Sequence, residues 1–209
     1  VKFTDKNKQD IIASISQLDG NKIEKFSFKN KEDIDKAILN IKNKQFSITD
    51  ISSKVIGRNP SGPFTTSTLQ QTASSRLGFG ASRTMQIAQK LYQGIDIEGE
   101  TIGLITYMRT DGTNLSKDAV DTFRSYIEKD LGKEYLPDEA LNYSGKKAKN
   151  AQEAHEAIRP TDIIRTPQSI KKYLSPDQNK MYDLIWSRAL SSQMASAKFD
   201  RNTITITSD

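Results

Sequence analysis

The sequence contains no cysteine and only one histidine, His155, among its 209 residues. The lack of cysteine excludes disulfides, thiol nucleophiles and zinc sites built on cysteine. A single histidine cannot supply a metal site that needs several. A chain without cysteine is compatible with the reducing cytoplasm, and we expect a cytoplasmic location.

Long apolar runs are also missing. No stretch reaches the roughly 18 apolar residues of a membrane-spanning helix, so no membrane association is predicted. The chain begins Val1-Lys2-Phe3, with neither an initiator methionine nor a leader, which predicts an internal piece of a longer protein. Its composition is 35% hydrophobic and 27% charged, as in ordinary globular proteins, and its length allows one medium or two small domains.

The formal charge of +5 is compatible with a polyanionic partner such as nucleic acid. Charge alone is a weak argument, because many cytosolic proteins carry a similar excess. The charge by itself therefore does not identify the partner.

The first part of the chain reads as a small α+β unit. Residues 11–16 and 24–28 alternate in polarity like strands, with the turn signal Asp19-Gly20-Asn21 between them, which predicts a hairpin. Apolar residues at positions 34, 37, 38 and 41 predict a helix, and Phe46 begins another strand.

Residues 57–63, Gly-Arg-Asn-Pro-Ser-Gly-Pro, predict a linker and a domain boundary. Four helices are expected after it, from cap signals followed by apolar residues at helical spacing. The expected caps are Thr66 or Ser67, then Ser82, Ser116 and Ser175, and the expected stops are Gly78, Gly94 and Gly132. Ser175 is the best defined cap, since Pro176 and Gln178 complete a capping box.

The chain ends in an alternating strand at residues 203–207, which needs a sheet to join. The simplest arrangement pairs this strand with the N-terminal unit, which makes the helical region an insertion. We therefore predict an α+β, multidomain chain with a β-rich first part at 1–62, an inserted helical domain at 63–194 and a return strand at 195–209.

The segment from Gly103 to Gly112 carries the most informative chemistry. If it is extended, Tyr107 and Arg109 share a face, and Arg109 could grip a phosphate while the Tyr107 oxygen attacks it. A protonated phenol is a poor nucleophile, which a nearby cation would improve. Asp111 could orient Arg109 or compete for it. From these residues alone, a structural strand with a half-buried Tyr107 is the favoured interpretation.

Two further segments suit phosphate contacts. His155 and Arg159 would share a face if they form a helical turn that ends at Pro160. A metalloprotease helix is excluded there, because Arg159 stands where the second histidine would be. Residues 63–71 are rich in hydroxyl and amide side chains and lie at an expected helix start. The free backbone N–H groups there are either capped by these side chains or able to bind a phosphate. From these residues alone, structural roles are favoured over phosphate binding for both segments.

Taken together, these segments resemble the bacterial type IA DNA topoisomerases. The matching strings are Pro63-Phe64-Thr65-Thr66-Ser67-Thr68-Leu69-Gln70-Gln71, Leu77-Gly78-Phe79-Gly80, Ile105-Thr106-Tyr107-Met108-Arg109-Thr110-Asp111 and Glu153-Ala154-His155-Glu156-Ala157-Ile158-Arg159-Pro160. Four strings in this order are a specific signal. The resemblance covers about residues 60–209 strongly, and the first 60 residues only by position.

The resemblance implies that Tyr107 attacks one DNA strand and forms a 5′-phosphotyrosine, after which a strand passes and the break is religated. Negative supercoils would relax without ATP. By match to the family motif, Arg109 positions the scissile phosphate, whereas Asp111, His155 and Arg159 bind DNA or support the site. The expected partners are single-stranded DNA and negatively supercoiled duplex, acted on by a monomer.

The family fold is a torus in which the tyrosine domain is inserted into a β-rich arch. The resemblance implies Mg²⁺ in the full-length enzyme, bound by an acidic domain that this chain lacks. Its one Asp-x-Asp pair, Asp33 and Asp35, lies in an amphipathic helix. No cofactor is expected in this chain, and the isolated piece is expected to be inactive. The competing hypotheses are a non-catalytic single-stranded DNA-binding or scaffold module derived from such an enzyme, and a tyrosine recombinase, whose Arg-His-Arg set is absent.

Overall fold

The computed structural model describes residues 1–4, 7–42, 44–143 and 156–208. The chain divides into two compact units: the first unit, Val1–Lys54 with Asp200–Asp209, and the helical unit, Val55–Phe199. The elements in chain order are β1 (Lys2–Thr4), β2 (Asp10–Ile12), β3 (Gln17–Leu18), β4 (Asn21–Lys22), α1 (Lys31–Lys42), β5 (Phe46–Arg58), α2 (Thr66–Leu77), α3 (Ala81–Gln93), β6 (Ile95–Ile97), β7 (Glu100–Ile102), α4 (Lys117–Tyr126), the π-helical turn η1 (Ile127–Leu131), the 3₁₀ turns η2 (Lys133–Tyr135) and η3 (Lys171–Tyr173), α5 (Pro176–Ser191) and β8 (Ala197–Ser208). The mixed α+β class agrees with the prediction.

The first unit contains short antiparallel pairs. β1 pairs with β2, and β3 pairs with β4 around Asp19 and Gly20, within the predicted turn. The predicted strand at 11–16 is only partly right, because β2 ends at Ile12 and pairs with β1. Asp19 and Gly20 have φ angles of 49° and 78°, the positive values that such a tight hairpin requires. The predicted strand at 24–28 is wrong. The backbone N–H of Ser27 bonds the Glu24 carbonyl, and the Ser27 hydroxyl accepts from the Glu24 N–H, so this stretch closes into a turn.

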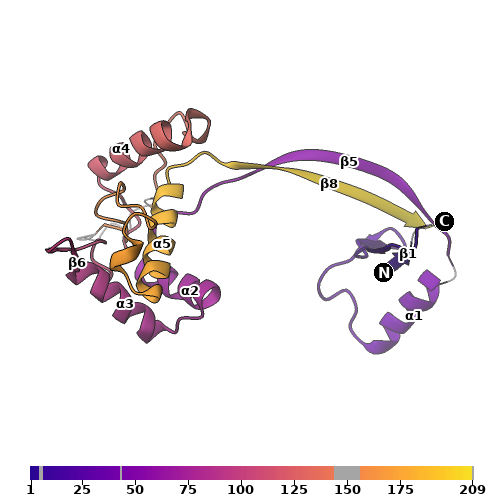
Figure 1. Cartoon of the computed structure of the whole chain (residues 1–209). Helices are drawn as coiled ribbons and strands as arrows, with labels where there is room; N and C mark the ends of the chain where they lie inside the picture. The colour runs from indigo at the N-terminus through magenta and orange to yellow at the C-terminus, as the bar shows by residue number, and fades with distance from the viewer. Residues whose placement is uncertain (5–6, 43, 144–155, 209) are drawn as a thin grey trace, which may run out of the picture. The chain divides into compact units, whose positions relative to one another are not determined.

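The helix predicted around Ile34 is α1, and the Asn30 side chain caps it by accepting from the Asp33 N–H. β5 pairs with β8, so the final strand joins a strand from the N-terminal region, as predicted. Figure 1 shows the two as long neighbouring ribbons. In the first unit, the Thr49 and Thr207 hydroxyls are 2.8 Å apart. β5 continues to Arg58, so the linker expected from Gly57 is shorter than predicted.

The helical unit is built on α2, α3 and α5, which pack on one another (Figure 1). Their shared core consists of Phe64, Leu69, Ala73, Phe79, Ile87, Ala88, Leu91, Leu104, Ile105, Met108, Ile158, Ile170, Met181, Tyr182 and Ile185. A second, smaller core around Phe123 and Ile127 joins α4 to the end of α5, and Trp186 packs against both cores. Within the described ranges, no helix is long and apolar enough to cross a membrane.

The helix caps explain where these helices begin and end. α5 has the predicted capping box of Ser175 and Gln178, and Ser116 caps α4 as expected. The expected caps of α2 and α3 are wrong. Thr65 caps α2 through a box with Thr68, and α3 begins after Gly80, with no side-chain cap.

Candidate active site

The segment that carries Tyr107 is bent and irregular, so the predicted strand at this position is wrong. Only Ile105 forms a β-bridge, with Pro160. Burial nevertheless alternates: Met108 and Thr110 are buried, Tyr107 is half-buried and Arg109 is exposed. A strand would need backbone hydrogen bonds to a neighbouring strand. Here, side-chain hydroxyls form hydrogen bonds with the backbone N–H and C=O groups of the segment instead.

Thr66 makes the first of these side-chain contacts, from the first residue of α2. Its hydroxyl donates to the carbonyl oxygens of Met108, at 2.8 Å, and Thr110, at 3.0 Å. It also accepts from the Thr110 N–H at 2.9 Å. The Thr66 N–H donates in turn to the Thr110 carbonyl. The start of α2 therefore binds the backbone on both sides of Arg109, rather than only closing its own first turn.

Thr106 makes the second contact, directly before Tyr107. Its hydroxyl donates to the Ala157 carbonyl at 2.8 Å and accepts from the Arg159 N–H at 3.0 Å. Its N–H donates to the Arg159 carbonyl. The Ile158 N–H, between these two residues, donates to the Phe64 carbonyl. Three motifs that are far apart in the sequence are thus joined by hydrogen bonds around Tyr107.

The segment also lies close against the end of α3. The Leu104 N–H donates to the Leu91 carbonyl, and Thr161 holds the Gly103 and Leu104 carbonyls through its hydroxyl and its N–H. A Cβ at Gly103 would lie 2.7 Å from the Tyr92 carbonyl oxygen, closer than side-chain carbons approach. Glycine is therefore required where the chain passes this helix.

The ring of Tyr107 packs edge-on against the ring of Tyr92, with centroids 5.4 Å apart and planes at 63°. Tyr107 also contacts the main core of the helical unit. Tyr92 is not recognisable as a site residue from the sequence, because its only signal is a place near the end of an expected helix, two residues before Gly94. The contact fixes the direction of the Tyr107 ring from one side.

Arg109 and Asp111 are both exposed. Over the described ranges they form no ion pair with each other or with any other residue. In the described structure, Asp111 therefore neither orients Arg109 nor competes for it through an ion pair. An exposed guanidinium that no described residue pairs with, two residues from Tyr107, is able to bind a phosphate.

Arg159 differs from Arg109, because its side chain is 16% exposed and two of its nitrogens have hydrogen-bond partners. Its Nε lies 2.6 Å from the Glu156 carboxylate, and one terminal nitrogen donates to the Pro160 carbonyl. Residues 156–160 form bridges and not the predicted helical turn, since Ile158 and Pro160 pair with Phe64 and Ile105. His155 lies outside the described residues.

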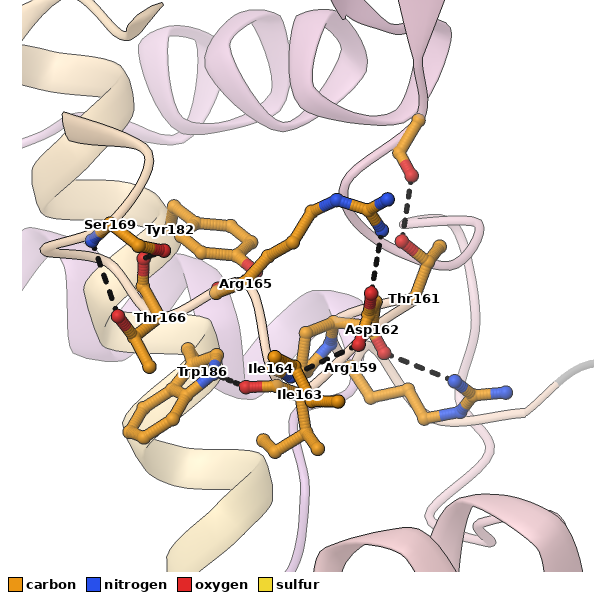
Figure 2. Close-up of polar contacts among 12 residues, drawn as sticks. Arg159, Thr161, Asp162, Ile163, Ile164, Arg165, Thr166, Ser169, Tyr182 and Trp186 are labelled. Atoms are coloured by element: carbon orange, nitrogen blue, oxygen red, sulfur yellow. Dashed lines mark hydrogen bonds and ion pairs between the residues drawn. The ribbon is translucent and has the colours of Figure 1, made fainter. Parts of the chain in front are cut away.

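The chain after Arg159 is fixed on α5, as Figure 2 shows. The Trp186 indole N–H donates to the Ile163 carbonyl at 2.9 Å, and the Tyr182 hydroxyl donates to the Arg165 carbonyl at 2.7 Å. Arg165 in turn pairs with Asp162 at 2.9 Å. Burial raises the pKa of Tyr182, so its hydroxyl retains the proton that it donates.

Changing Tyr182 to phenylalanine is expected to lower the free energy of unfolding by about 1–2 kcal/mol, because the Arg165 carbonyl loses its hydroxyl partner inside the core. Urea unfolding followed by Trp186 fluorescence would measure this, since Trp186 is the only tryptophan. The matched control is Tyr135→Phe, because Tyr135 is 48% exposed. Equal stability of the two variants would contradict the role given to Tyr182.

Changing Thr66 to valine removes the hydroxyl but keeps the branched shape. We expect a loss of roughly 2–3 kcal/mol, because the Thr110 N–H and the Met108 carbonyl lose their partner in a part-buried place. Thr122→Val is the matched control: Thr122 is exposed on α4, and a change within about 0.5 kcal/mol is expected there. A control-like result for Thr66→Val would show that Thr66 does not hold the Tyr107 segment.

The described part of the chain contains no group of three histidine, cysteine or acidic residues that could hold a metal ion. Asp111 is the one carboxylate on the Tyr107 segment, and a single carboxylate is a poor magnesium site. The residues around Tyr107 therefore do not fit a metal by themselves.

Comparison with known proteins agrees with this arrangement of motifs. The sequence model of the DNA topoisomerase family matches residues 1–209 of the chain. The chain belongs to this family. Among its relatives, DNA topoisomerase 1 of Rickettsia felis is 48% identical over 200 residues, which are 96% of this chain and 26% of that protein. DNA topoisomerase 1 of Campylobacter jejuni is 47% identical over 190 residues, which are 91% of this chain and 27% of that protein.

A solved structure gives the same result for the fold. Full-length topoisomerase I from Thermotoga maritima is 36% identical and superposes with a TM-score of 0.69 over 91% of this chain and 29% of that one. The resemblance to the bacterial type IA topoisomerases is therefore confirmed. The topoisomerase chain described here spans about a quarter of the length of its relatives.

Proposed function

We propose that this chain is the tyrosine-bearing part of a type IA DNA topoisomerase, which cleaves one DNA strand through a 5′-phosphotyrosine, passes a strand and religates the break. The substrates would be single-stranded DNA and negatively supercoiled duplex. The supporting observation is the segment of Tyr107 and Arg109, held on one side by Thr66 and on the other by Thr106. Rigid support of this kind places a nucleophile within the narrow geometry that an attack requires.

In the proposed cleavage step, the Tyr107 oxygen attacks the phosphorus of a phosphodiester. The bond from this oxygen to phosphorus forms, and the bond from phosphorus to the 3′ oxygen breaks. The phenolic proton is lost to a base or to solvent, and the 3′ oxygen takes up a proton. Religation reverses these changes. The energy of the broken ester is retained in the phosphotyrosine, so no ATP is consumed.

Arg109 would bind the non-bridging oxygens of the same phosphate, where negative charge grows in the transition state. Its exposed side chain, without an ion-pair partner among the described residues, suits this role. Asp111, His155 and Arg159 remain proposed as DNA-binding or supporting residues. For Arg159 the contact with Glu156 favours support. Mg²⁺ would be held by another part of the enzyme, and no step here depends on it.

The isolated chain is expected to neither nick nor relax plasmid DNA, because it contains only the tyrosine side of the site. Negatively supercoiled plasmid with Mg²⁺ and without ATP would be incubated with the chain and, separately, with the full-length enzyme. Relaxation by the full-length enzyme alone supports the proposal. Relaxation by the isolated chain would contradict the proposal that the active site is shared with another part of the enzyme. Inactivity of both the isolated chain and the full-length protein would favour a non-catalytic DNA-binding or scaffold module.

A further inference from the structure

Tyr92, the next-to-last residue of α3, is in direct contact with the proposed nucleophile. Its ring lies edge-on against the ring of Tyr107, with the centroids 5.4 Å apart and the planes at 63°. Aromatic pairs favour this geometry, because the positive edge of one ring meets the negative face of the other. Tyr107 is only half-buried, so the core alone does not enclose its ring. The contact with Tyr92 therefore restricts the directions that this ring can take.

The contact is made by the ring of Tyr92 and not by its hydroxyl. Among the described residues, the Tyr92 hydroxyl has no hydrogen-bond partner. Tyr92 is also 40% exposed, and it belongs to neither core of the helical unit. Its ring therefore contributes little to the interior, and the ring contact that the structure shows for it is the one with Tyr107.

The backbone that carries Tyr92 is held in place. The preceding residue, Leu91, is fully buried, and its carbonyl accepts from the Leu104 N–H at 2.8 Å. The Gly103 backbone lies so close to Tyr92 that a Cβ there would come within 2.7 Å of the Tyr92 carbonyl oxygen. The end of α3 and the start of the Tyr107 segment are therefore in direct backbone contact.

The chain between these two positions is a closed hairpin. β6 pairs with β7, and Ile95 faces Ile102 at the open end of the hairpin. Near its turn, the Glu98 carboxylate accepts from the Tyr173 hydroxyl of η3 at 2.5 Å. Both ends of the hairpin are thus fixed, and the backbones that carry the two aromatic rings are held together by it.

A tyrosine that attacks phosphorus must point its oxygen in one direction. A tyrosine side chain without neighbours rotates between staggered χ1 wells, and only a narrow range of directions brings the oxygen to its target. A neighbour that favours one well raises the fraction of molecules that are ready to attack. An edge-on aromatic pair is strong enough to change this fraction by about 3–10-fold.

We propose that Tyr92 is a positioning residue, whose ring holds the ring of Tyr107 in the direction from which the Tyr107 oxygen attacks DNA. This inference rests on the proposed function. Once Tyr107 is joined to the 5′ phosphate, the covalent bond itself restricts its ring, and the contact with Tyr92 is no longer needed for this purpose. Tyr92 therefore speeds cleavage but not religation.

The test uses the full-length enzyme with Tyr92→Leu, which removes the aromatic ring and keeps a side chain that is favourable in a helix. Cleavage of a short single-stranded oligonucleotide is followed at saturating enzyme, so that DNA affinity does not enter the rate. Religation is measured separately, by giving the isolated adduct a strand with a free 3′ hydroxyl. Affinity is measured by fluorescence anisotropy of a labelled oligonucleotide.

Three further variants complete the design. Tyr92→Phe keeps the ring and removes the hydroxyl. Tyr92→Gln is a second variant without a ring, which suits an exposed helix position and guards against a fault of folding specific to leucine. Tyr135→Leu is the matched control, because it makes the same change at another tyrosine of the helical unit, which is 48% exposed.

Tyr92→Leu and Tyr92→Gln are expected to cleave about 3–10-fold more slowly than the parent, with unchanged religation and unchanged affinity for the oligonucleotide. Tyr92→Phe and Tyr135→Leu are expected to cleave at the parent rate. Slow cleavage by Tyr92→Phe would assign the effect to the hydroxyl and overturn the inference. Equal slowing of cleavage and religation would show a general disturbance of the site, which overturns it as well.

Failure of this inference is distinguishable from failure of the proposed function. If the parent forms covalent adducts and Tyr92→Leu cleaves at the rate of Tyr135→Leu, only the positioning role of Tyr92 is wrong. If the parent forms no adduct, the proposed function fails, whatever the Tyr92 variants do.

Discussion

Replacing Tyr107 with phenylalanine in the full-length enzyme is expected to abolish both covalent DNA adducts and plasmid relaxation, a loss of at least about 10⁴-fold. The ring of Tyr107 packs on Tyr92 and on the core, and phenylalanine preserves those contacts. The substitution removes only the hydroxyl, which is the proposed nucleophile. The fold should therefore be unchanged while the chemistry is lost.

Relaxation of negatively supercoiled plasmid and gel detection of adducts measure the effect, and Trp186 fluorescence checks the fold. Tyr135→Phe removes the hydroxyl of an exposed tyrosine and is expected to retain parent activity. If Tyr107→Phe still relaxes DNA, Tyr107 is not the nucleophile. The chain would then be closer to the non-catalytic module considered from its sequence.

Replacing Arg109 with glutamine is expected to reduce the rate of cleavage by about 10²–10³-fold, the usual effect of removing one donor to a transition-state oxygen. Stability should change by no more than about 0.5 kcal/mol, because Arg109 is exposed and pairs with no described residue. A large loss of activity with little loss of stability is the signature of a residue that acts on the substrate.

Single-turnover cleavage of an oligonucleotide at saturating enzyme, with urea unfolding alongside, separates these two quantities. Arg109→Lys should recover part of the rate, since it retains the charge but not the two parallel donors. Lys117→Gln removes an exposed charge at the start of α4 and serves as control. Equal cleavage rates for Arg109→Gln and this control would exclude Arg109 from the site.

Much of the helical unit was predictable, because its helix signals are local. The capping box of Ser175 and Gln178, the Ser116 cap and the left-handed Gly78 after α2 are each determined by a few neighbouring residues. The misplaced cap of α2 has a physical cause. Thr65 and Thr66 are chemically equivalent as caps, and the hydroxyl of Thr66 is bound to Met108, more than 40 residues away.

The conformation around Tyr107 was not predictable from spacing. Alternating residues suggested a strand, but a strand requires neighbours that extend its ladder. In the structure, the hydroxyls of Thr66 and Thr106 satisfy the backbone groups instead. Tertiary contacts of this kind produce no periodic pattern in the sequence. The motifs could therefore be assigned to one site, but the hydrogen bonds between them could not be predicted.

The short strands of the first unit were equally difficult. The turn at Asp19 and Gly20 was predicted, because two positive φ angles favour these residue types, but the strands beside it are Gln17–Leu18 and Asn21–Lys22 and not the predicted ones. The stretch that follows was misread, since the Ser27 hydroxyl closes a local turn that competes with a strand.

Identifying the residue that becomes joined to DNA would test the tyrosine assignment most directly. The full-length enzyme would be incubated with a single-stranded oligonucleotide, denatured and digested with protease, and the DNA-linked peptide would be sequenced by mass spectrometry. A 5′-phosphate ester on the Tyr107 oxygen, with a free 3′ hydroxyl on the released strand, is the predicted result. An adduct on any other residue, or a linkage to a 3′ phosphate, would contradict it.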